Sequence, residues 1–380
     1  MTCYRLSNTT DMQAFLKRLD VSKEGLAQLL PKTSLNLIYI KDLRTPAANI
    51  LKQDALSIGA DVAVPKDAIT CKDTHVDAVL IANDKQLKHL CLKEKAQPFG
   101  LKALAQKLST LSMTSNDDFT IMGVLNANDD SFYKASRFSH DDALVRIKRM
   151  IEEGVHIIDV GGVSSRPGSV GISEEEELMR LKPIIDVIST EKLHEQVVFS
   201  LDSYSPLCLE YALQRGFGIV NDITALSDDR VAKVAAHYQA TVVLMHMQGT
   251  PKQMQQRPHY EDIIDELDVF FEERIAKAKA YGIEKLILDV GIGFGKSLEH
   301  NLLLLKHHAH FLHFGYPLLV GASRKSMIDT IYQSAIEERL AGTLALHIKA
   351  YENGASILRV HDVKEHVQAL SVVQALNKIF

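Results

Sequence analysis

The chain of 380 residues lacks several features that would assign it to a particular class. It has no run of roughly 18 apolar residues, the length that a membrane-spanning helix needs. Its start, MTCYRLSNTTDMQ, has no basic segment followed by an apolar one, so we expect no signal peptide. Positive charge is not in excess, because the formal net charge is −5. We therefore expect neither nucleic acid nor membrane as a partner.

Cysteine is also scarce, and tryptophan is absent. Cys3, Cys71, Cys91 and Cys208 are scattered and form no C-x-x-C pair. This usage predicts a reduced, cytoplasmic chain whose thiols pack as ordinary residues. With 46% apolar and 24% charged residues, the chain can bury a full core, and its length indicates two domains or one large one.

From about residue 113, short apolar runs alternate with amphipathic helical stretches. The runs are rich in β-branched residues and apolar on both faces, which is typical of parallel strands covered on each side. The eight runs are 120–126, 155–162, 197–204, 218–223, 241–247, 285–291, 318–325 and 356–362. Eight strands with intervening helices favour a (β/α)₈ TIM barrel, for which about 250 residues are typical. A doubly wound open sheet is the alternative.

The first part of the chain has a different pattern. NLIYIKDL, DVAVP and VDAVLIAN resemble strands, and PAANILKQDALSIG and DKQLKHLCLKEKA resemble helices. The polar stretch 109–118, STLSMTSNDD, is typical of a linker. We therefore predict a small N-terminal α/β domain of unknown role over residues 1–112, followed by the barrel over residues 113–380.

A polar or charged residue follows almost every apolar run of the predicted barrel. In such barrels the active site forms at the C-terminal ends of the strands. A single polar residue there could be a helix cap, but eight on one rim indicate a site. The residues are Asn126, Ser164, Ser165, Arg166, Asp202, Asn221, His246, Asp289, Ser323, Arg324, Lys325, Arg359 and His361.

The chemistry of this set divides in two. Asp202, Asn221 and Asp289 offer carboxylate and amide groups, which suit a flat ring that bears several N–H and carbonyl groups. Cations suit a phosphate or diphosphate, and Arg166, Lys325, Arg359 and His361 supply them. Asn126 adds a neutral oxygen ligand that is acceptable to Mg²⁺. A polar ring, a diphosphate and Mg²⁺ together indicate displacement of pyrophosphate.

The segment from about 120 to 375 resembles dihydropteroate synthase. The resemblance rests on an ordered series of motifs: IIDVGG followed by SSRPGS, SLDSY, IVNDI, LMHMQGTP, LDVGIGFGKSLEHN, GYPLLVGASRKSMI, EERLAGT and GASILRVHDV. It implies an enzyme, a transferase of folate biosynthesis. That family joins 6-hydroxymethyl-7,8-dihydropterin diphosphate to 4-aminobenzoate, giving 7,8-dihydropteroate and pyrophosphate. It also implies Mg²⁺ as cofactor and a homodimer formed through barrel helices.

The resemblance further implies roles for individual residues. The pterin would be bound by Asp202, Asn221, Ile223, Met245, Asp289, Gly321, Lys325 and Arg359. The diphosphate and Mg²⁺ would be held by Asn126, Arg359 and His361, with Asn126 as the metal ligand. The 4-aminobenzoate pocket would be formed by Phe132, Ser165, Arg166, Pro167, Phe294 and Ser326. The catalytic set would be Asn126, Arg166, Lys325, Arg359 and His361.

Three positions depart from the family's pattern. In the first loop, Lys134 replaces an acidic residue and the usual glycines are missing; Val163 and Val290 replace a glutamate and a proline. Two alternatives therefore stay open. One is a pterin-dependent methyltransferase that shares the barrel and the pterin site, and the other is a non-catalytic pterin-binding protein.

Two stretches have other interpretations. DVGIGFGKS, residues 289–297, resembles a phosphate-binding loop, but Val290 stands where that motif requires its first glycine. We instead expect its glycines to let the backbone turn beside the ligands, and Lys296 to lie at the surface or cap a helix. KHHAHFLH places His310 and His313 three residues apart, but no third metal ligand is evident, so an exposed helix is favoured.

Overall fold

The structure, a computed structural model, describes residues 6, 10–111, 118–127, 140–162, 172–249, 254 and 258–378. Its backbone separates into two compact units, residues 1–114 with 374–380 and residues 115–373. Among the described residues, no helix is both long and apolar enough to cross a membrane.

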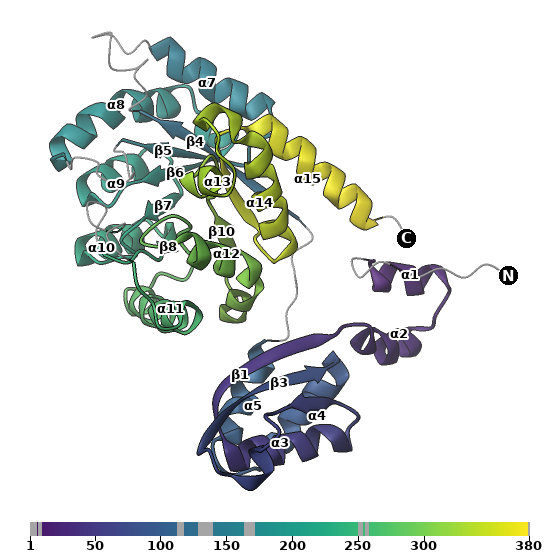
Figure 1. Cartoon of the computed structure of the whole chain (residues 1–380). Coiled ribbons are helices and arrows are strands. Elements are labelled where there is room, and N and C mark those ends of the chain that lie inside the picture. The colour runs from purple at the N-terminus through teal and green to yellow at the C-terminus, as the bar shows by residue number, and fades with distance from the viewer. Residues whose placement is uncertain are drawn as a thin grey trace. The chain divides into compact units, whose positions relative to one another are not determined.

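The second unit is a closed barrel of eight parallel strands surrounded by helices (Figure 1). This confirms the predicted TIM barrel and excludes the open sheet. Around the barrel the strands follow the order β10-β11-β4-β5-β6-β7-β8-β9. The strands are β4 (Thr120–Asn126), β5 (Ile157–Gly161), β6 (Val198–Asp202), β7 (Ile219–Asp222), β8 (Thr241–Met245), β9 (Leu286–Asp289), β10 (Leu318–Val320) and β11 (Ile357–Val360). The helices are α7 (His140–Glu152), α8 (Glu174–Thr190), α9 (Pro206–Leu213), α10 (Asp229–His237), α11 (Ile263–Ala280), α12 (Leu298–Lys306), α13 (Ser326–Ile331), α14 (Leu340–Glu352) and α15 (Val363–Lys378), with short 3₁₀ helices η3 (Leu193–Glu195), η4 (His308–Phe314) and η5 (Ile336–Glu338).

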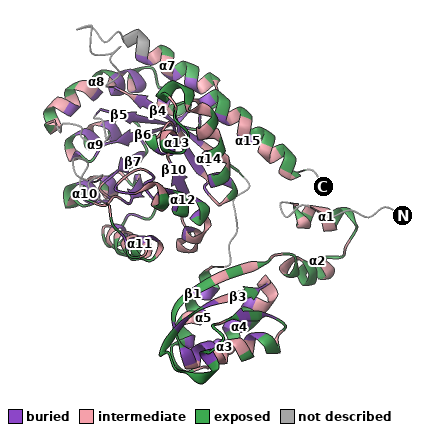
Figure 2. Ribbon diagram, viewed as in Figure 1, coloured by how far each residue is buried: buried purple, intermediate pink, exposed green. Residues whose placement is uncertain are grey.

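Two hydrophobic layers explain why the runs form strands. Alternate side chains point outward and pack against the helices, and the others fill the inside of the barrel. The inner layer consists of Met122, Ile157, Ile219, Val243, Ile287, Leu319 and Ile357, one from each of seven strands. Figure 2 shows the strands buried at the centre, with helices whose outer surfaces are exposed.

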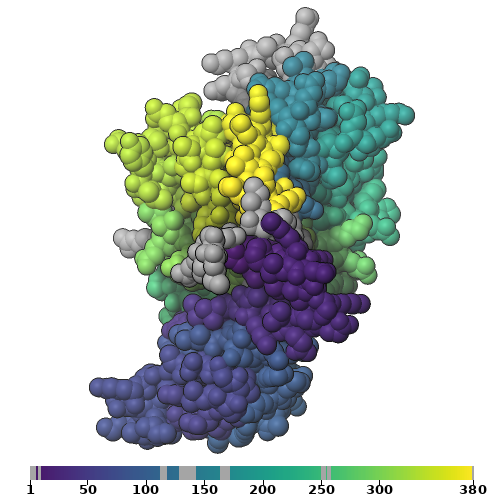
Figure 3. Space-filling view, turned by 90° about the vertical axis from the view of Figure 1, so that its right-hand side faces the viewer, coloured from purple at the N-terminus to yellow at the C-terminus, as the bar shows by residue number. Residues whose placement is uncertain are grey.

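The first and last strands of the barrel close it. β11 pairs with β4 in parallel register, from Ile357 opposite Thr120 to Val360 opposite Gly123. On the outside the last helix completes the ring, and Figure 3 shows α15 between α14 and α7. Gly123 has no side chain at this seam, where a Cβ atom would lie only 2.3 Å from the Met150 side chain of α7. A larger residue at position 123 would therefore clash with the helices that cover this seam.

The first unit is a small α/β domain with its own hydrophobic core. Its sheet has the order β1-β3-β2, and β3 is antiparallel to both neighbours. The strands are β1 (Asn36–Arg44), β2 (Asp61–Ala63) and β3 (His75–Ala82). The helices are α1 (Met12–Arg18), α2 (Lys23–Leu29), α3 (Thr45–Ser57), α4 (Asp84–Glu94) and α5 (Leu101–Thr110), with 3₁₀ helices η1 (Leu30–Lys32) and η2 (Ala68–Thr70).

Two details of this unit differ from the sequence interpretation. The predicted linker begins at residue 109, but α5 continues to Thr110, and residues 112–117 lie outside the described part of the chain. Cys71 is exposed rather than packed, whereas Cys91 and Cys208 are buried; all three are free thiols.

One carboxyl group of the first unit is buried without a compensating partner. Glu94, the last residue of α4, is 0% exposed, and neither of its oxygens has a hydrogen-bonding partner in the described structure. Burial raises its pKa to about 7, and the neighbouring Asp54 contributes to the shift. The folded unit therefore retains the Glu94 proton at a pH where the unfolded chain has released it.

We predict that Glu94→Gln stabilises the first unit at pH 8 and has little effect near pH 4.5. Between pH 4.5 and 7 the folded unit keeps the Glu94 proton, whereas the unfolded chain has lost it. The free energy of unfolding therefore falls as pH rises over that range. The gain at pH 8 should be on the order of 1–2 kcal/mol. Protection of α4 amides from hydrogen exchange measures it. Glu24→Gln, at an exposed site, is the control; equal effects of the two variants at both pH values would contradict the prediction.

Candidate active site

The interior face of the barrel carries the candidate site. Because side chains alternate along a strand, the residues two positions after the inner apolar layer point into the mouth of the barrel. Ile219 is followed by Asn221, Ile287 by Asp289 and Ile357 by Arg359. The register therefore brings polar side chains from distant parts of the sequence to the C-terminal end of one barrel.

Arg359 lies at the centre of this group. Its Nε donates to Asp159 Oδ2 and its Nη2 donates to Asp202 Oδ2, both at 2.7 Å. The Nδ2 of Asn221 donates to the same Asp159 oxygen at 3.0 Å. Four strands, β5, β6, β7 and β11, are therefore joined by hydrogen bonds among three charged groups and one amide.

The electrostatics of the group follow from its burial. Burial alone would lower the pKa of Arg359, but the carboxylates of Asp159 and Asp202 raise it above its ordinary value. Burial raises the pKa of Asp202, aided by Asp159, although Arg359 acts in the opposite direction. The guanidinium is thus permanently charged, and the carboxylates around it are held close by that charge.

Asp289 and Lys325 form a second group of opposite charges near Arg359. Asp289 Oδ1 accepts a hydrogen bond from Gly291 N at 2.7 Å, and Lys325 Nζ donates to the carbonyl of Ile292. Burial raises the pKa of Asp289, and the Gly291 N–H and Lys325 oppose this shift. Burial lowers the pKa of Lys325 to about 8, opposed by Asp289. A lysine with such a pKa can exist in both protonation states near neutral pH.

Lys296 is not the surface or capping residue that the sequence suggested. It is buried, and its Nζ lies 2.9 Å from His246 Nδ1 and donates to three backbone carbonyls, those of His246, Gly291 and Phe294, at 3.0–3.2 Å. Burial lowers its pKa to about 7. Its role is to fasten the 291–296 loop to the end of β8. The capping role belongs to Ser297, whose side chain accepts from His300 N at the start of α12.

The glycines of this loop are required by its shape. Gly291, Gly293 and Gly295 all have positive φ, between 63° and 82°. A Cβ atom at Gly291 would lie 1.9 Å from the carbonyl oxygen of His246, and one at Gly295 would lie 2.6 Å from that of Gln248. The expectation that these glycines let the backbone turn sharply is therefore confirmed.

The rim above β10 and β11 is held by a chain of histidines. His347 Nε2 accepts from Ala322 N at 3.0 Å, so its Nδ1 carries the hydrogen and donates to His366 Nε2 at 2.9 Å. His366 Nδ1 then donates to the carbonyl of Asp362 at 2.6 Å. The Asp362 carboxylate binds Arg324, so the loops after both strands are connected.

His361 and Asn126 lie at two other strand ends. His361 Nδ1 lies 2.9 Å from Ser323 Oγ, which connects it to the loop after β10. Asn126 ends β4, and a Cβ atom at the neighbouring Gly161 would lie 3.5 Å from Asn126 Oδ1 and 3.7 Å from Asp202 Cβ. Asn126 and Asp202 therefore flank the same backbone position.

Most other predicted site residues can be placed. Met245 ends β8, Ile223 follows β7 and both are buried; Gly321 follows β10, where a Cβ atom would lie 3.6 Å from Arg359 Cβ. Phe294 has its ring centroid 4.5 Å from Lys325 Nζ, and Ser326 is exposed at the first turn of α13. Phe132, Ser165, Arg166 and Pro167, together with Lys134 and Val163, lie outside the described residues.

One central residue was missed. Asp159 is fully buried, holds Arg359 and Asn221 through one oxygen, and has no partner for Oδ1 in the described structure. The signal was a carboxylate in the middle of the apolar run IIDV. The sequence pattern indicates the residues after each run, whereas Asp159 lies two positions before the end of its strand.

Comparisons with known proteins agree with this geometry. The family model of "pterin binding enzyme" matches residues 122–361. A bifunctional dihydropteroate synthase/dihydropteroate reductase of Helicobacter pylori is 45% identical, and the alignment covers 98% of each chain. A dihydropteroate synthase of Escherichia coli is also 45% identical, over 67% of this chain and 90% of that protein. The crystal structure of Xanthomonas albilineans dihydropteroate synthase with 4-aminobenzoic acid has a TM-score of 0.64 and 36% identity, over 70% of this chain and 95% of that one.

We predict that Lys296→Met destabilises the barrel by about 2–3 kcal/mol, because it removes the donor that three carbonyl groups share; of these, the Gly291 carbonyl keeps a second donor, Phe294 N. Amide hydrogen exchange in residues 290–297 should accelerate together with the fall in melting temperature. Lys285→Met, an exposed lysine just before β9, is the matched control and should change neither. Equal stability of the two variants would contradict the role assigned to Lys296.

Proposed function

Because this chain belongs to the family of pterin-binding enzymes and is a dihydropteroate synthase, we propose how its residues perform that reaction. The enzyme condenses 6-hydroxymethyl-7,8-dihydropterin diphosphate with 4-aminobenzoate, and it forms 7,8-dihydropteroate and pyrophosphate in folate biosynthesis. The observation that carries our assignment of roles is the Asp159–Arg359–Asp202 cluster at the barrel mouth, with Asn221 and Asp289 beside it.

The pterin ring binds to the acceptors that the protein leaves in this cluster. Asp202 uses Oδ2 for Arg359, Asn221 uses its Nδ2 for Asp159, and Asp289 uses Oδ1 for Gly291. The remaining oxygen of each carboxylate and the Oδ1 of Asn221 are left to accept hydrogen bonds from the N–H edge of the ring. Met245 and Ile223 supply the apolar contacts to the ring, and Gly321 leaves space beside Arg359.

The diphosphate binds to the cations on the same rim. An arginine has five N–H donors, and Arg359 uses one on Nε and one on Nη2 for the carboxylates, so the others can reach the diphosphate. Lys325 and His361 lie at neighbouring strand ends and complete the binding site. Arg166, outside the described residues, keeps the catalytic role inferred from its motif.

We assign Mg²⁺ to Asn126. This neutral amide oxygen at the end of β4 flanks Asp202, and a single protein oxygen fits a cation that takes most of its ligands from water and substrate phosphate. When bound, Mg²⁺ supplies charge stabilisation to the leaving diphosphate.

The 4-aminobenzoate pocket lies over the pterin site in our proposal. Phe294 offers an aromatic face beside Lys325, and Ser326 opens α13 on the same loop as Lys325. Phe132, Ser165, Arg166 and Pro167, which lie outside the described residues, are the remaining pocket residues that the family motifs predict.

The reaction needs no general base. The amine of 4-aminobenzoate is neutral at pH 7, so it attacks without prior loss of a proton. The C–O bond between the exocyclic carbon and the diphosphate breaks, a C–N bond forms, and the amine then loses its proton to water or the leaving group. Arg359 and His361 stabilise the charge that develops on the diphosphate, and Asp202 and Asp289 hold the ring so that it can share positive charge on the carbon.

We also propose a cytoplasmic homodimer that assembles through barrel helices. An exposed apolar group supports this: Ile331, Tyr332 and Ile336, at and just beyond the end of α13, are 56%, 78% and 46% exposed.

A second activity is favoured by one comparison. The Helicobacter pylori relative named as both synthase and dihydropteroate reductase aligns with 98% of this chain, which includes the first unit. We therefore propose that this chain also reduces 7,8-dihydropteroate. That step adds one hydride and one proton to a C=N bond, so it needs an external donor such as reduced flavin or reduced nicotinamide nucleotide.

We predict that the purified chain releases pyrophosphate only when the dihydropterin diphosphate, 4-aminobenzoate and Mg²⁺ are all present. Mass spectrometry of the product should show 7,8-dihydropteroate. Removal of Mg²⁺ by a chelator should reduce the rate at least tenfold, because the leaving group then loses its charge stabilisation.

Asp202→Asn tests the residue roles in the same assay. It should weaken pterin binding and turnover at least tenfold, because it removes a carboxylate that holds both the ring and Arg359. Asp61→Asn, on an exposed position of the first unit, is the control. Pterin binding without pyrophosphate release would favour the non-catalytic alternative, and methyl transfer to a corrinoid protein would favour the methyltransferase.

For the second activity, we expect the chain to convert 7,8-dihydropteroate, in the presence of a reduced flavin or nicotinamide donor, to a product two hydrogen atoms heavier. Liquid chromatography with mass spectrometry measures this product. Reactions without donor or with heat-denatured chain are the controls. If the product forms no faster than in these controls with either donor, the reductase proposal is wrong.

A further inference from the structure

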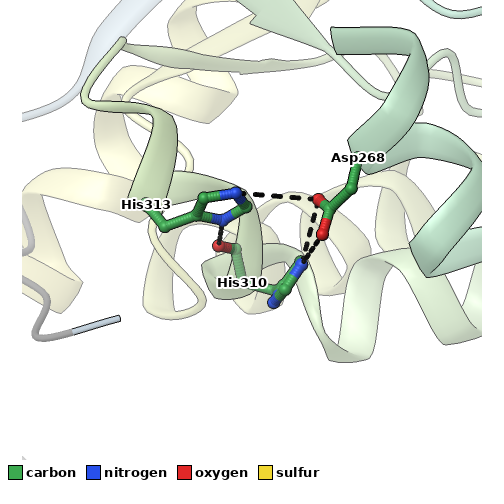
Figure 4. Close-up of side chains that lie close together, drawn as sticks. All are labelled: Asp268, His310 and His313. Atoms are coloured by element: carbon green, nitrogen blue, oxygen red, sulfur yellow. Dashed lines mark hydrogen bonds and ion pairs between the residues drawn. The ribbon is translucent and has the colours of Figure 1, made fainter. Parts of the chain in front are cut away.

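A cluster of one carboxylate and two imidazoles contains none of the strand-end residues of the active site. Asp268 comes from α11, and His310 and His313 come from η4 (Figure 4). One potential ligand atom from each residue lies within 4.8 Å of the other two. The sequence interpretation found no third ligand for these histidines; the structure supplies Asp268, 42 residues before His310.

The local backbone explains why the two imidazoles lie on the same side. A 3₁₀ helix has three residues per turn, so residues i and i+3 are eclipsed. His310 and His313 therefore lie above one another, with ring centroids 4.8 Å apart, and His308 and Phe311 on another side are buried. Phe271 of α11 packs against Phe311 and Phe314, which fixes the helix and η4 relative to each other.

The hydrogen bonds set the tautomer of His313. Its Nδ1 lies 2.6 Å from the backbone carbonyl of His310, which can only accept, so Nδ1 carries the hydrogen. In the neutral ring Nε2 then carries the lone pair. That atom faces Asp268 Oδ1 at 3.8 Å, so two electron-rich atoms are directed at each other. Imidazoles that bind a metal commonly donate their other N–H to a backbone carbonyl in this way.

The distances fit a small divalent cation. Tetrahedral zinc with bonds of about 2.0–2.2 Å separates its ligand atoms by about 3.3–3.6 Å. His310 Nε2 lies 2.9 and 3.0 Å from the two Asp268 oxygens, and His313 Nε2 lies 3.8 Å from the nearer one, so the observed distances bracket that range. The three side chains are between 16% and 28% exposed, which leaves access for the ion and for a water as fourth ligand.

We propose that Asp268, His310 and His313 form a zinc-binding site that joins α11 to η4. Two imidazoles and one carboxylate are a ligand set that zinc prefers and that Mg²⁺ does not. The site is therefore chemically distinct from the Mg²⁺ site assigned to Asn126. Its effect is structural: a bound ion connects the helix before β9 to the segment that leads into β10.

The site can be tested with the full chain stripped of metal by a chelator. Equilibrium dialysis against Zn²⁺ should show one more bound ion per chain in the unaltered protein than in Asp268→Asn or His313→Ala, and zinc should raise the melting temperature of the unaltered protein by several degrees. His307→Ala is the matched control, because this exposed histidine precedes η4 and is not one of the three ligands. It should keep both the ion and the thermal shift.

The outcomes separate the proposal from a simple ion pair between His310 and Asp268. Equal zinc binding by the His307→Ala and His313→Ala proteins, both checked for native circular dichroism, overturns it. If His313→Ala fails to fold, X-ray absorption of the zinc-loaded unaltered chain decides. Two imidazole ligands and one carboxylate on the bound zinc support the site, and any other ligand set overturns it.

Discussion

The mouth of the barrel depends on one partly buried cation. Arg359 lies between the carboxylates of Asp159 and Asp202, and Asp289 adds a third acidic group nearby. Carboxylates gathered this closely in a buried place would repel one another without a compensating charge. Their residues come from β5, β6 and β9, and the arginine from β11, so the charges meet only when the barrel has closed. The closed barrel and the ligand site therefore both require Arg359 to compensate the charge of these carboxylates.

The barrel could be predicted because its signal is repeated and local. Each strand is a short apolar run, and each run is followed by polar residues that the closed sheet brings to one end. The strands themselves are shorter than the runs: β10 ends at Val320, although the predicted run continued to Lys325. Some of the extra residues are predicted site residues, such as Lys325, whereas Asp202, Asn221, Asp289 and Arg359 lie within the strands themselves.

What the sequence did not reveal depends on long-range geometry. Nothing in the sequence distinguishes Lys296 from an exposed lysine. It is buried because its ammonium group donates to the carbonyls of His246, Gly291 and Phe294. Asp159 interrupts an apolar run, and only its contacts with Arg359 and Asn221 distinguish it from an ordinary strand residue. In the first unit, the antiparallel sheet and the helices α1, α2 and α5 were not predicted, since their runs are short and no motif identifies them.

The pairing of β4 with β11 has a consequence for synthesis of the chain. β4 leaves the ribosome early, but its partner contains residues 357–360, so at 5–20 residues per second one edge of β4 waits roughly 10–50 s for its neighbour. The first unit has its whole sheet within residues 36–82 and can form during that delay. The barrel cannot, and an unpaired apolar strand edge is prone to association with other chains. The nascent barrel therefore exposes one edge of β4 to other chains until the last strand has been made.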